Sequence, residues 1–314
     1  MRMIQSTRSR RGTKYATRLS AREGTLPNDS ITRAIIPAAG LGTRLLSVTK
    51  EQPKEMLPVF APTQNGGTAL KPTVQLIFEQ LQDCGIRQFC FVVGRGKRAI
   101  EDHFTPDWNF VKLLQSKDKQ DQASDLVAFY QRVTKSSIFW VNQSEPRGFG
   151  DAVLTGKAVS DGNPVLVHAG DNHVISSNGD HIKRLMKAHN ASGADATLLL
   201  RRVVDPRQYG VAEVTRQRGE IVVKHVVEKP ERPATKLALL PTYIFKPVIF
   251  EALESIKPGK GGELQLTDAI EELIRRGLKV RAVQLKKGEF WLDVGTPETY
   301  WQALSMSHES LSGK

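Results

Sequence analysis

Apolar residues follow two different periods along this chain from residue 31 onward. Short, nearly continuous apolar runs are typical of buried strands, whereas apolar residues that recur every three or four positions are typical of amphipathic helices. Strands are predicted at 34–37, 88–93, 137–141, 164–168, 196–202, 221–227 and 280–285. Helices are predicted at 73–84, 98–103, 150–159, 181–190 and 266–276, with a helical excursion in the polar stretch 108–135. This alternation predicts an α/β fold, with a Rossmann-like, mostly parallel sheet flanked by helices.

Two stretches interrupt the alternation. Residues 62–71 hold two glycines, two threonines and a proline, a composition typical of a surface loop. Residues 1–30 hold seven Lys and Arg against two acidic residues, and so contribute +5 to the formal net charge of +12. This composition predicts a disordered basic arm. We therefore expect an arm at 1–30, one domain at 31–305 and a tail at 306–314.

The basic arm has more than one functional interpretation. We favour a solvated tail, and nucleic-acid binding is the alternative that its charge suggests. Tyr15 is the only aromatic residue among residues 1–30, whereas sites for single-stranded nucleic acid interleave charges with aromatic rings. We therefore expect no nucleic acid as a partner. A targeting peptide has a similar composition and stays open.

Length and composition place the chain among globular proteins with a real core. It has 314 residues, of which 39% are hydrophobic and 25% charged. No apolar run is long enough to span a bilayer, and no signal-peptide core is present. The two cysteines, Cys84 and Cys90, offer neither a disulfide framework nor zinc-ligand spacing. These features predict a cytoplasmic protein with reduced thiols and no membrane partner.

Small and cationic residues follow the first predicted strand. Residues 39–44, Ala-Gly-Leu-Gly-Thr-Arg, contain G-x-G but lack the third glycine of a dinucleotide fingerprint, and no P-loop pattern occurs. Such a loop lets backbone N–H groups approach phosphate oxygens, and Arg44 and Lys54 add positive charge. An ordinary βα turn is the alternative. Similar clusters follow later strands at 170–172 and 228–230, and we expect the three to meet where sheets of this class bind ligands.

Asp171 and Asp293 each stand beside glycine at the end of an apolar run. Two such carboxylates can share one Mg²⁺, which takes its other ligands from phosphate oxygens and water. A turn or helix-cap aspartate is the alternative for each residue. Mg²⁺ is the cofactor that we expect.

Two weaker signals involve polar side chains. Glu228 could accept hydrogen bonds from hydroxyl groups, and Lys229 could contact a phosphate. A surface ion pair between the two residues is the alternative. Gln143, upstream of Gly148, offers an amide to the edge of a nucleobase. The seven histidines are scattered, and we expect structural or surface roles for them. No G-x-S-x-G pattern points to an acyl-transfer nucleophile.

Taken together, these residues resemble the sugar-phosphate nucleotidyltransferases, from about residue 32 to about residue 305. The segments that carry the resemblance are 39–44, 53–58, 148–154, 226–230 and 262–270. Those that point to the branch of bacterial-type UTP–glucose-1-phosphate uridylyltransferases are 54–58, 100–104 and 265–269. The resemblance implies the nucleotide-diphospho-sugar transferase fold. It also implies that UTP and glucose 1-phosphate react to give UDP-glucose and pyrophosphate.

The resemblance further implies a role for each candidate residue. Arg44, Lys54 and Lys229 would be catalytic, and Asp171 and Asp293 would hold Mg²⁺. The residues implied to bind the nucleotide are Ala39, Gly40, Gly42, Thr43, Gln143 and Gly148. Those implied to bind the sugar are Gly210, Glu228 and Lys229. Members of the family are commonly homo-oligomers, so we expect a dimer or tetramer.

Three departures from the family pattern leave the choice of base open. Residues 170–172 and 291–296 look more like the glucose-1-phosphate thymidylyltransferase branch, residues 62–71 lengthen a loop, and the basic arm has no counterpart. A thymidylyltransferase or another NDP-sugar pyrophosphorylase is therefore the first alternative. A non-catalytic sugar-nucleotide-binding protein is a remote one, because the candidate catalytic residues are all present.

Overall fold

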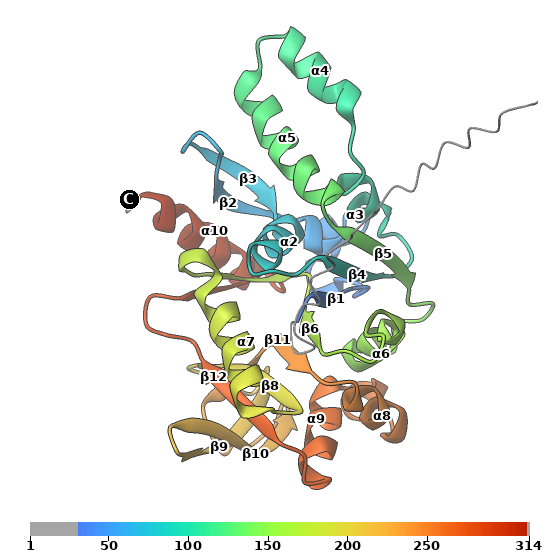
Figure 1. The fold of residues 1–314 in the computed structure, drawn as a ribbon, viewed down its shortest axis with the longest axis vertical. Helices are drawn as coiled ribbons and strands as arrows, with labels where there is room; N and C mark the ends of the chain where they lie inside the picture. The colour runs from blue at the N-terminus through green and yellow to red at the C-terminus, as the bar shows by residue number, and fades with distance from the viewer. Residues whose placement is uncertain (1–30, 313–314) are drawn as a thin grey trace, which may run out of the picture. The chain divides into compact units, whose positions relative to one another are not determined.

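The computed structural model describes residues 31–312, so the predicted arm at 1–30 lies outside the described residues. The strands are β1 Arg33–Ala38, β2 Pro58–Pro62, β3 Thr68–Pro72, β4 Gln88–Val93, β5 Ser137–Asn142, β6 Val165–His168, β7 Asn172–Ile175, β8 Ala196–Arg202, β9 Gly210–Gln217, β10 Glu220–Glu228, β11 Leu237–Phe245, β12 Val280–Gln284 and β13 Phe290–Asp293. The α-helices are α1 Leu46–Thr49, α2 Thr73–Asp83, α3 Arg98–His103, α4 Trp108–Ser116, α5 Gln120–Thr134, α6 Phe149–Thr155, α7 Asp180–Ser192, α8 Val248–Ser255, α9 Leu266–Arg275 and α10 Pro297–Ser312. Figure 1 shows these elements.

The central sheet has nine strands in the order β5-β4-β1-β6-β11-β8-β12-β10-β9. The neighbours β5-β4-β1-β6 run parallel, as does the pair β8-β12. Strand β11 enters antiparallel between β6 and β8, and β10 pairs antiparallel with both β12 and β9. The predicted α/β fold is confirmed. The sheet is more mixed than predicted. Strand β11, which the sequence pattern did not reveal, is antiparallel to both of its neighbours, and β9 and β10 are also antiparallel to each other.

The core lies on both faces of this sheet, because successive strand residues point to opposite sides. Ile35 of β1 packs with apolar residues of α6, α8 and α9. Ile36, one position later, packs with those of α2, α5 and α7. Both side chains are fully buried. This two-sided burial explains why the strands appear in the sequence as continuous apolar runs.

Residues 62–71 are not a plain surface loop, which corrects the prediction. They belong to a hairpin of β2 and β3, in which Val59 pairs with Lys71 and Ala61 with Ala69. Val59 and Ala61 are buried on one side of the hairpin, while the connecting turn is exposed. Glycine and threonine mark that turn, but the two strands are too short for their alternation to stand out.

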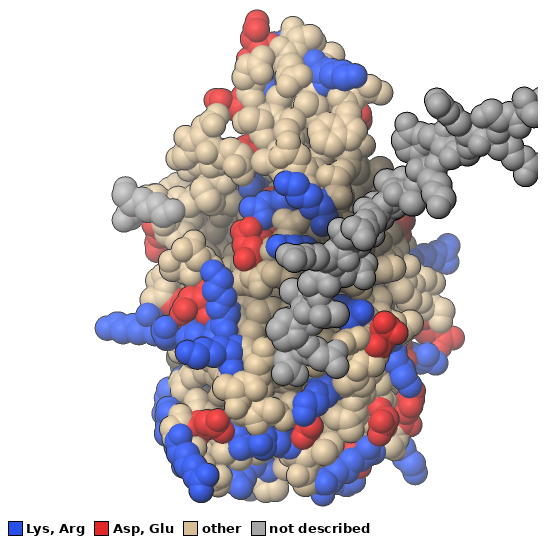
Figure 2. Space-filling model, viewed as in Figure 1, with Lys and Arg blue, Asp and Glu red and all other residues tan. Residues whose placement is uncertain are grey.

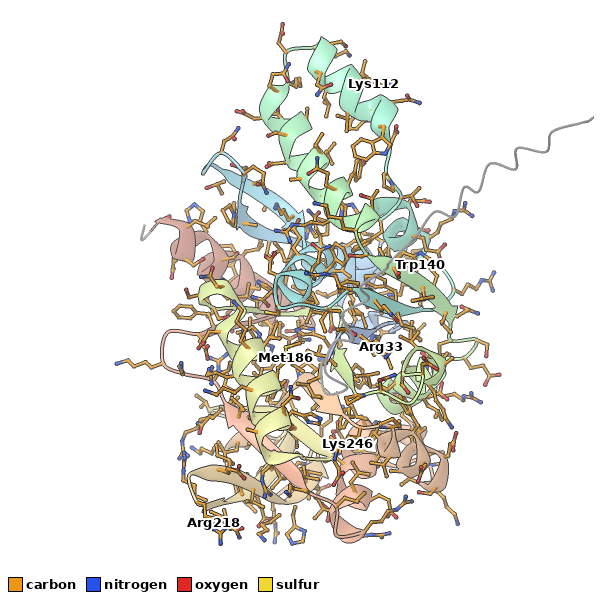
Figure 3. The ribbon with its side chains drawn as sticks, viewed as in Figure 1. Arg33, Lys112, Trp140, Met186, Arg218 and Lys246 are labelled. Atoms are coloured by element: carbon orange, nitrogen blue, oxygen red, sulfur yellow. The ribbon has the colours of Figure 1, made fainter. Side chains whose placement is uncertain are left out.

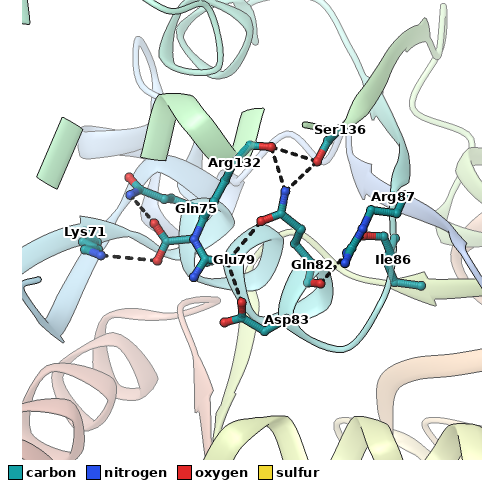
Figure 4. Close-up of polar contacts among 9 residues, drawn as sticks. All are labelled: Lys71, Gln75, Glu79, Gln82, Asp83, Ile86, Arg87, Arg132 and Ser136. Carbon is teal, nitrogen blue, oxygen red and sulfur yellow. Dashed lines mark hydrogen bonds and ion pairs between the residues drawn. The ribbon is translucent and has the colours of Figure 1, made fainter. Parts of the chain in front are cut away.

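The polar stretch 108–135 forms two helices, α4 and α5, as its helical spacing predicts. A polar network ties α5 to α2 (Figure 4). The amide of Gln82 donates to the Arg132 carbonyl at 2.7 Å, and the Arg132 guanidinium reaches Asp83 at 2.6 Å. Lys112 lies on α4 at one end of the ribbon, whereas Arg218, between β9 and β10, lies at the other end (Figure 3).

The C-terminal helix α10 continues through the predicted domain end at 305 to Ser312. It packs against β2, where Ser307 accepts a hydrogen bond from the backbone N–H of Phe60 at 3.2 Å. Strands β2, β3, β7, β9, β11 and β13 and helices α1, α8 and α10 were not predicted. Figure 2 shows Lys and Arg side chains gathered over the lower part of the face drawn, where β9 and β10 lie. Among the helices of residues 31–312, none is long and apolar enough to cross a membrane.

Candidate active site

A cleft of about 680 Å³ opens at the carboxyl ends of β1, β6 and β10. The three predicted clusters all contribute to its lining. Strand β10 runs in the direction opposite to β1 and β6, and its last residue, Glu228, pairs with Gly210 at the start of β9, which also lines the cleft. Every residue that the sequence nominates for the site lines this cleft: Ala39, Gly40, Gly42, Thr43, Arg44, Lys54, Gln143, Gly148, Asp171, Gly210, Glu228, Lys229 and Asp293. Their individual roles stay predictions, but the structure brings them together.

The loop after β1 reverses direction at Gly42, whose φ of 68° suits glycine. Its carbonyl accepts a hydrogen bond from the Thr49 hydroxyl at 2.8 Å, which closes the loop on itself. Arg44 follows in a short 3₁₀ turn, Thr43–Leu45, and its guanidinium lies beside Gly295. Gly42 therefore serves the shape of the loop, and Arg44 extends across the cleft toward the end of β13.

Lys54 and Asp171 form an ion pair within the cleft, with both side chains largely shielded from solvent. Burial disfavours both charges, but their mutual attraction outweighs it. The pKa of Lys54 is therefore raised and that of Asp171 is lowered. Both groups are charged at neutral pH, which gives the cleft a fixed cation at its floor.

A second ion pair, between Glu55 and Lys97, adjoins the pair of Lys54 and Asp171. Glu55 is 1% exposed and accepts a hydrogen bond from the Lys97 ammonium at 2.9 Å. Burial raises the pKa of Glu55, and the charges of Lys97 and Lys54 partly oppose that rise. A Cβ at Gly170 would stand 3.2 Å from the Glu55 side chain, so glycine at that position leaves room for the carboxylate. The negative charge of Glu55 also helps to keep the pKa of Lys54 raised.

Strands β7 and β13 bring Asp171 and Asp293 together. Asp293 pairs with Asn172, the neighbour of Asp171, and the N–H of Val294 donates to the Asp171 carbonyl at 3.2 Å. Burial and the charge of Asp171 raise the pKa of Asp293 to about 6, although Arg44 and Lys54 pull it down. Two shielded carboxylates that repel each other across a cleft are a suitable donor set for a divalent cation.

No group of three or more His, Cys, Asp or Glu side chains within residues 31–312 is arranged to hold a metal ion. A cation held by Asp171 and Asp293 would therefore take its remaining ligands from water or from a bound phosphate. That arrangement fits Mg²⁺, which keeps several waters and binds through one or two carboxylates.

Metal binding at these carboxylates is expected to depend on pH. The folded-state pKa of Asp293 lies above the ordinary value of 3.8, so in the metal-free protein this group stabilises the fold below about pH 4, and the stabilisation disappears as the pH rises through about 6. We expect Mg²⁺ to raise the melting temperature more at pH 7 than at pH 5. The pH dependence of this shift should vanish in Asp293→Asn; an identical dependence in that variant would contradict the ligand role.

Glu228 ends strand β10, Lys229 follows it, and both residues line the cleft. Their charged groups pair at 3.0 Å, and Glu228 also accepts a hydrogen bond from the Thr267 hydroxyl at 2.6 Å. Lys229 has a φ of 42°, which a non-glycine residue rarely adopts. Its N–H donates to the Tyr209 carbonyl at 3.0 Å, and its carbonyl accepts from the Lys260 ammonium. These bonds hold a strained backbone that turns the Lys229 side chain toward the cleft.

Gly210 faces the same end of the cleft. A Cβ there would lie 2.6 Å from Leu239 Cδ1 and 3.0 Å from the Thr267 hydroxyl. Glycine is therefore required for packing as well as for the predicted access of a sugar to the backbone.

We expect Gly210→Ala to cost about 1–3 kcal/mol in the free energy of unfolding, through overpacking against Leu239. It should also raise KM for the sugar substrate. Adding Leu239→Val removes the clashing methyl group, so stability should recover while KM stays raised. Recovery of both quantities would show that Gly210 serves packing alone. Urea unfolding and steady-state kinetics give the two readouts.

The sequence missed several cleft residues whose role depends on tertiary contacts. Asn172 donates to Asp171 at 2.8 Å and accepts from the Trp291 indole N–H at 2.6 Å. Thr267 orients Glu228, as described above. Each lies within a segment that the sequence singles out, 170–172 for Asn172 and 262–270 for Thr267, but nothing in the pattern assigns these two side chains a role in the site. The others that line the cleft include Glu55, Gln208, Tyr209, Gln265 and Thr299.

No histidine from the described part of the chain lines the cleft. The nearest in sequence to Asp171, His168 and His173, are buried. Burial lowers the pKa of His168 to about 4 and that of His173 to about 3, so both are neutral at physiological pH. Cys84 and Cys90 are both free thiols. The polar side chains of the cleft are therefore lysine, arginine, carboxylate, amide and hydroxyl groups.

The glycine-containing loop after β1, two lysines and two carboxylates line one cleft of an α/β fold, which is what a nucleotidyl-transfer site requires. The family model described as nucleotidyl transferase matches residues 33–310. The chain belongs to this family, and the predicted membership is confirmed.

Relatives of known name share most of their length with this chain. A UTP–glucose-1-phosphate uridylyltransferase of Pseudomonas aeruginosa is 33% identical over 288 residues, which cover 90% of this chain and 97% of that protein. One of Staphylococcus epidermidis is 38% identical over 249 residues, covering 77% and 81%.

Solved structures are also similar to this chain over most of its length. A UDP-glucose pyrophosphorylase complexed with UDP-glucose superposes with a TM-score of 0.75 at 30% identity, covering 90% of this chain and 100% of that one. A UTP-bound UGPase from Acinetobacter baumannii superposes with a TM-score of 0.74 at 28% identity, covering 91% and 99%. The predicted fold type is thereby confirmed.

Proposed function

We propose that this chain is a UTP–glucose-1-phosphate uridylyltransferase that uses Mg²⁺. The observation that carries the proposal is the cleft itself, whose lining brings Arg44, Lys54 and Lys229 together with the carboxylates Asp171 and Asp293. The relatives named above support the choice of UTP and glucose 1-phosphate.

In the proposed reaction, a phosphate oxygen of glucose 1-phosphate attacks the α-phosphorus of UTP. A new bond forms between that oxygen and the α-phosphorus, the bond between the α-phosphorus and its bridging oxygen to the β-phosphorus breaks, and pyrophosphate leaves. The attacking phosphate is already anionic near neutral pH. No residue has to remove a proton, which agrees with the absence of histidine among the described residues of the cleft.

Catalysis then consists of positioning and charge neutralisation. Lys54, held by Asp171 and backed by Glu55 and Lys97, places a fixed cation at the floor of the cleft for the phosphates that undergo transfer. Arg44 accompanies the triphosphate and the leaving pyrophosphate. A divalent cation held by Asp171 and Asp293 would neutralise further charge on the phosphate oxygens.

Lys229 and its neighbours form the end of the cleft proposed for the sugar phosphate. Lys229 would bind the phosphate, and Glu228, already aligned by the Thr267 hydroxyl, would accept hydrogen bonds from sugar hydroxyls. Lys54 and Lys229 would thereby allow the two phosphate groups of like charge to come close enough to react, because each lysine neutralises one of them.

A thymidylyltransferase is the second candidate, and one observation favours it. Asp171 is followed by Asn172, whose side chain bonds both Asp171 and Trp291, and these are the segments that look like the thymidylyltransferase branch.

Pyrophosphate release with glucose 1-phosphate and Mg²⁺ tests the proposal, with UTP, dTTP, ATP, CTP and GTP compared in parallel. We expect a strong preference for UTP. A preference for dTTP would move the chain to the second candidate with the same site chemistry. No release with any nucleotide, or with other sugar 1-phosphates, would contradict the proposed reaction.

A further inference from the structure

The amide of Gln143 is held in one orientation inside the cleft. Its Nε2 donates to Asp151 Oδ2 at 2.7 Å and to the Gly148 carbonyl at 3.2 Å. Both partners are hydrogen-bond acceptors when Asp151 is ionised, so the nitrogen of the amide, and not its oxygen, must face them. The amide oxygen accepts no hydrogen bond from residues 31–312, and it is not among their fully buried unpaired atoms. It is therefore the part of this cleft-lining side chain that is free to meet a ligand.

Asp151 is itself fixed. Its Oδ1 pairs with the Arg147 guanidinium at 3.1 Å, which leaves Oδ2 for Gln143. Asp151 is 7% exposed and Gln143 is 6% exposed. The segment between them is held by two backbone hydrogen bonds, because Gly150 donates to the Leu264 carbonyl at 2.8 Å and Leu264 donates to the Arg147 carbonyl at 2.8 Å. A half-turn of the Gln143 amide would set its oxygen against the Asp151 carboxylate, which is unfavourable.

We propose that Asp151 is a positioning residue that sets the choice of pyrimidine base by locking Gln143 with its oxygen toward the nucleobase. Uracil and thymine carry an N–H donor at N3, which an amide oxygen can accept. Cytosine has an acceptor at N3, and two acceptors repel each other. The inference rests on the proposed function and adds to it the group that distinguishes UTP from CTP.

Asp151→Asn removes the constraint on the orientation of the Gln143 amide with almost no change in the shape of the side chain at position 151. The new amide can donate to the Gln143 oxygen, so Gln143 can turn and present its NH₂ group to the cleft. We expect the ratio of kcat/KM for UTP to that for CTP to fall by roughly tenfold, the effect of about one hydrogen bond. The rate with dTTP should fall in parallel with UTP, since both bases carry the N3 donor. KM for glucose 1-phosphate should not change. Asp151→Ser, whose hydroxyl can also donate or accept, is a second variant with the same expectation.

A coupling experiment separates positioning from a structural role. In a Gln143→Leu background the amide is gone, so Asp151→Asn should no longer change the UTP to CTP ratio. Asp118→Asn, at an exposed position in the α4–α5 connection, makes the same chemical change as a control and should leave the ratio at the wild-type value.

Binding of UTP and CTP by calorimetry gives the same ratio without turnover. An unchanged ratio in both Asp151→Asn and Asp151→Ser would overturn the inference while leaving the proposed function intact. Preferential UTP binding by a wild-type protein that forms no UDP-glucose would contradict the proposed function instead. A ratio that falls equally with and without the Gln143 amide would assign Asp151 a structural role and likewise overturn the inference.

Discussion

Replacing Lys54 with methionine is expected to lower kcat by on the order of 10²–10³-fold. Methionine keeps most of the length and apolar surface of the side chain but removes its charge. The loss should be large because Lys54 lies in a shielded part of the cleft, where a single charge acts strongly on the transferring phosphate. Because the charge matters most as pyrophosphate departs, kcat should fall more than KM rises, and steady-state kinetics with UTP and glucose 1-phosphate measures both.

A matched control for Lys54 is available in the same chain. Lys71 pairs with Glu79 at 3.3 Å, and its side chain is 12% exposed, against 16% for Lys54. Lys71 lies in the hairpin strand β3 and does not line the cleft. We expect Lys71→Met to change stability but leave kcat within about twofold. Near-normal turnover in Lys54→Met would contradict the proposed role of this lysine.

Replacing Lys229 with methionine is expected to lower kcat/KM by on the order of 10²-fold, with the loss mainly on the sugar-phosphate side. Lys229 is held in its unusual backbone conformation by bonds from both its N–H and its carbonyl, which places its charge at one end of the cleft. We therefore expect KM for glucose 1-phosphate to rise while KM for UTP stays close to its normal value. Titrating each substrate at saturating concentrations of the other separates the two effects.

Lys246 provides the comparison for Lys229. It pairs with Asp195 at 3.0 Å and its side chain is 40% exposed, close to the 46% of Lys229, which pairs with Glu228 at the same distance. Lys246 does not contribute to the cleft. Lys246→Met should therefore keep both KM values. If the two variants lost activity equally, the effect would reflect stability, and the assignment of Lys229 to the sugar phosphate would fail.

Much of the fold follows from the sequence because buried strands of an α/β sheet are apolar on both faces. Strands β4 and β8 and helix α3 were predicted with the bounds that the structure has. The missed elements include long ones, such as the nine-residue β11, whose apolar run contains Pro241, and two very short ones. Strands β7 and β13 have four residues each and form a separate small sheet. Four residues carry too little alternation to signal a strand.

The site was predictable wherever chemistry coincides with a strand end. The loop after β1, the segment after β6 and the end of β10 all carry unusual residues at such positions, and all line the cleft. What the sequence could not reveal is the pairing of side chains. The ion pair of Lys54 with Asp171, for example, joins residues that stand 117 positions apart.

The position of Glu55 shows the same limit. Its sequence neighbour Lys54 was singled out for its charge, and Glu55 looks like an exposed acid in the same motif. The structure buries it against Lys97, which the sequence leaves among ordinary surface residues. Burial of a charge depends on contacts between distant segments, so local pattern does not report it.

The transfer of the uridylyl group itself is the central claim, and labelled UTP tests it most directly. With glucose 1-phosphate and Mg²⁺, label at the α-phosphate of UTP should appear in UDP-glucose, and label at the γ-phosphate should appear in pyrophosphate. Chromatography of the products after a single turnover distinguishes these positions. Recovery of the γ-label on the sugar, or of the α-label in unreacted UTP alone, would contradict the account.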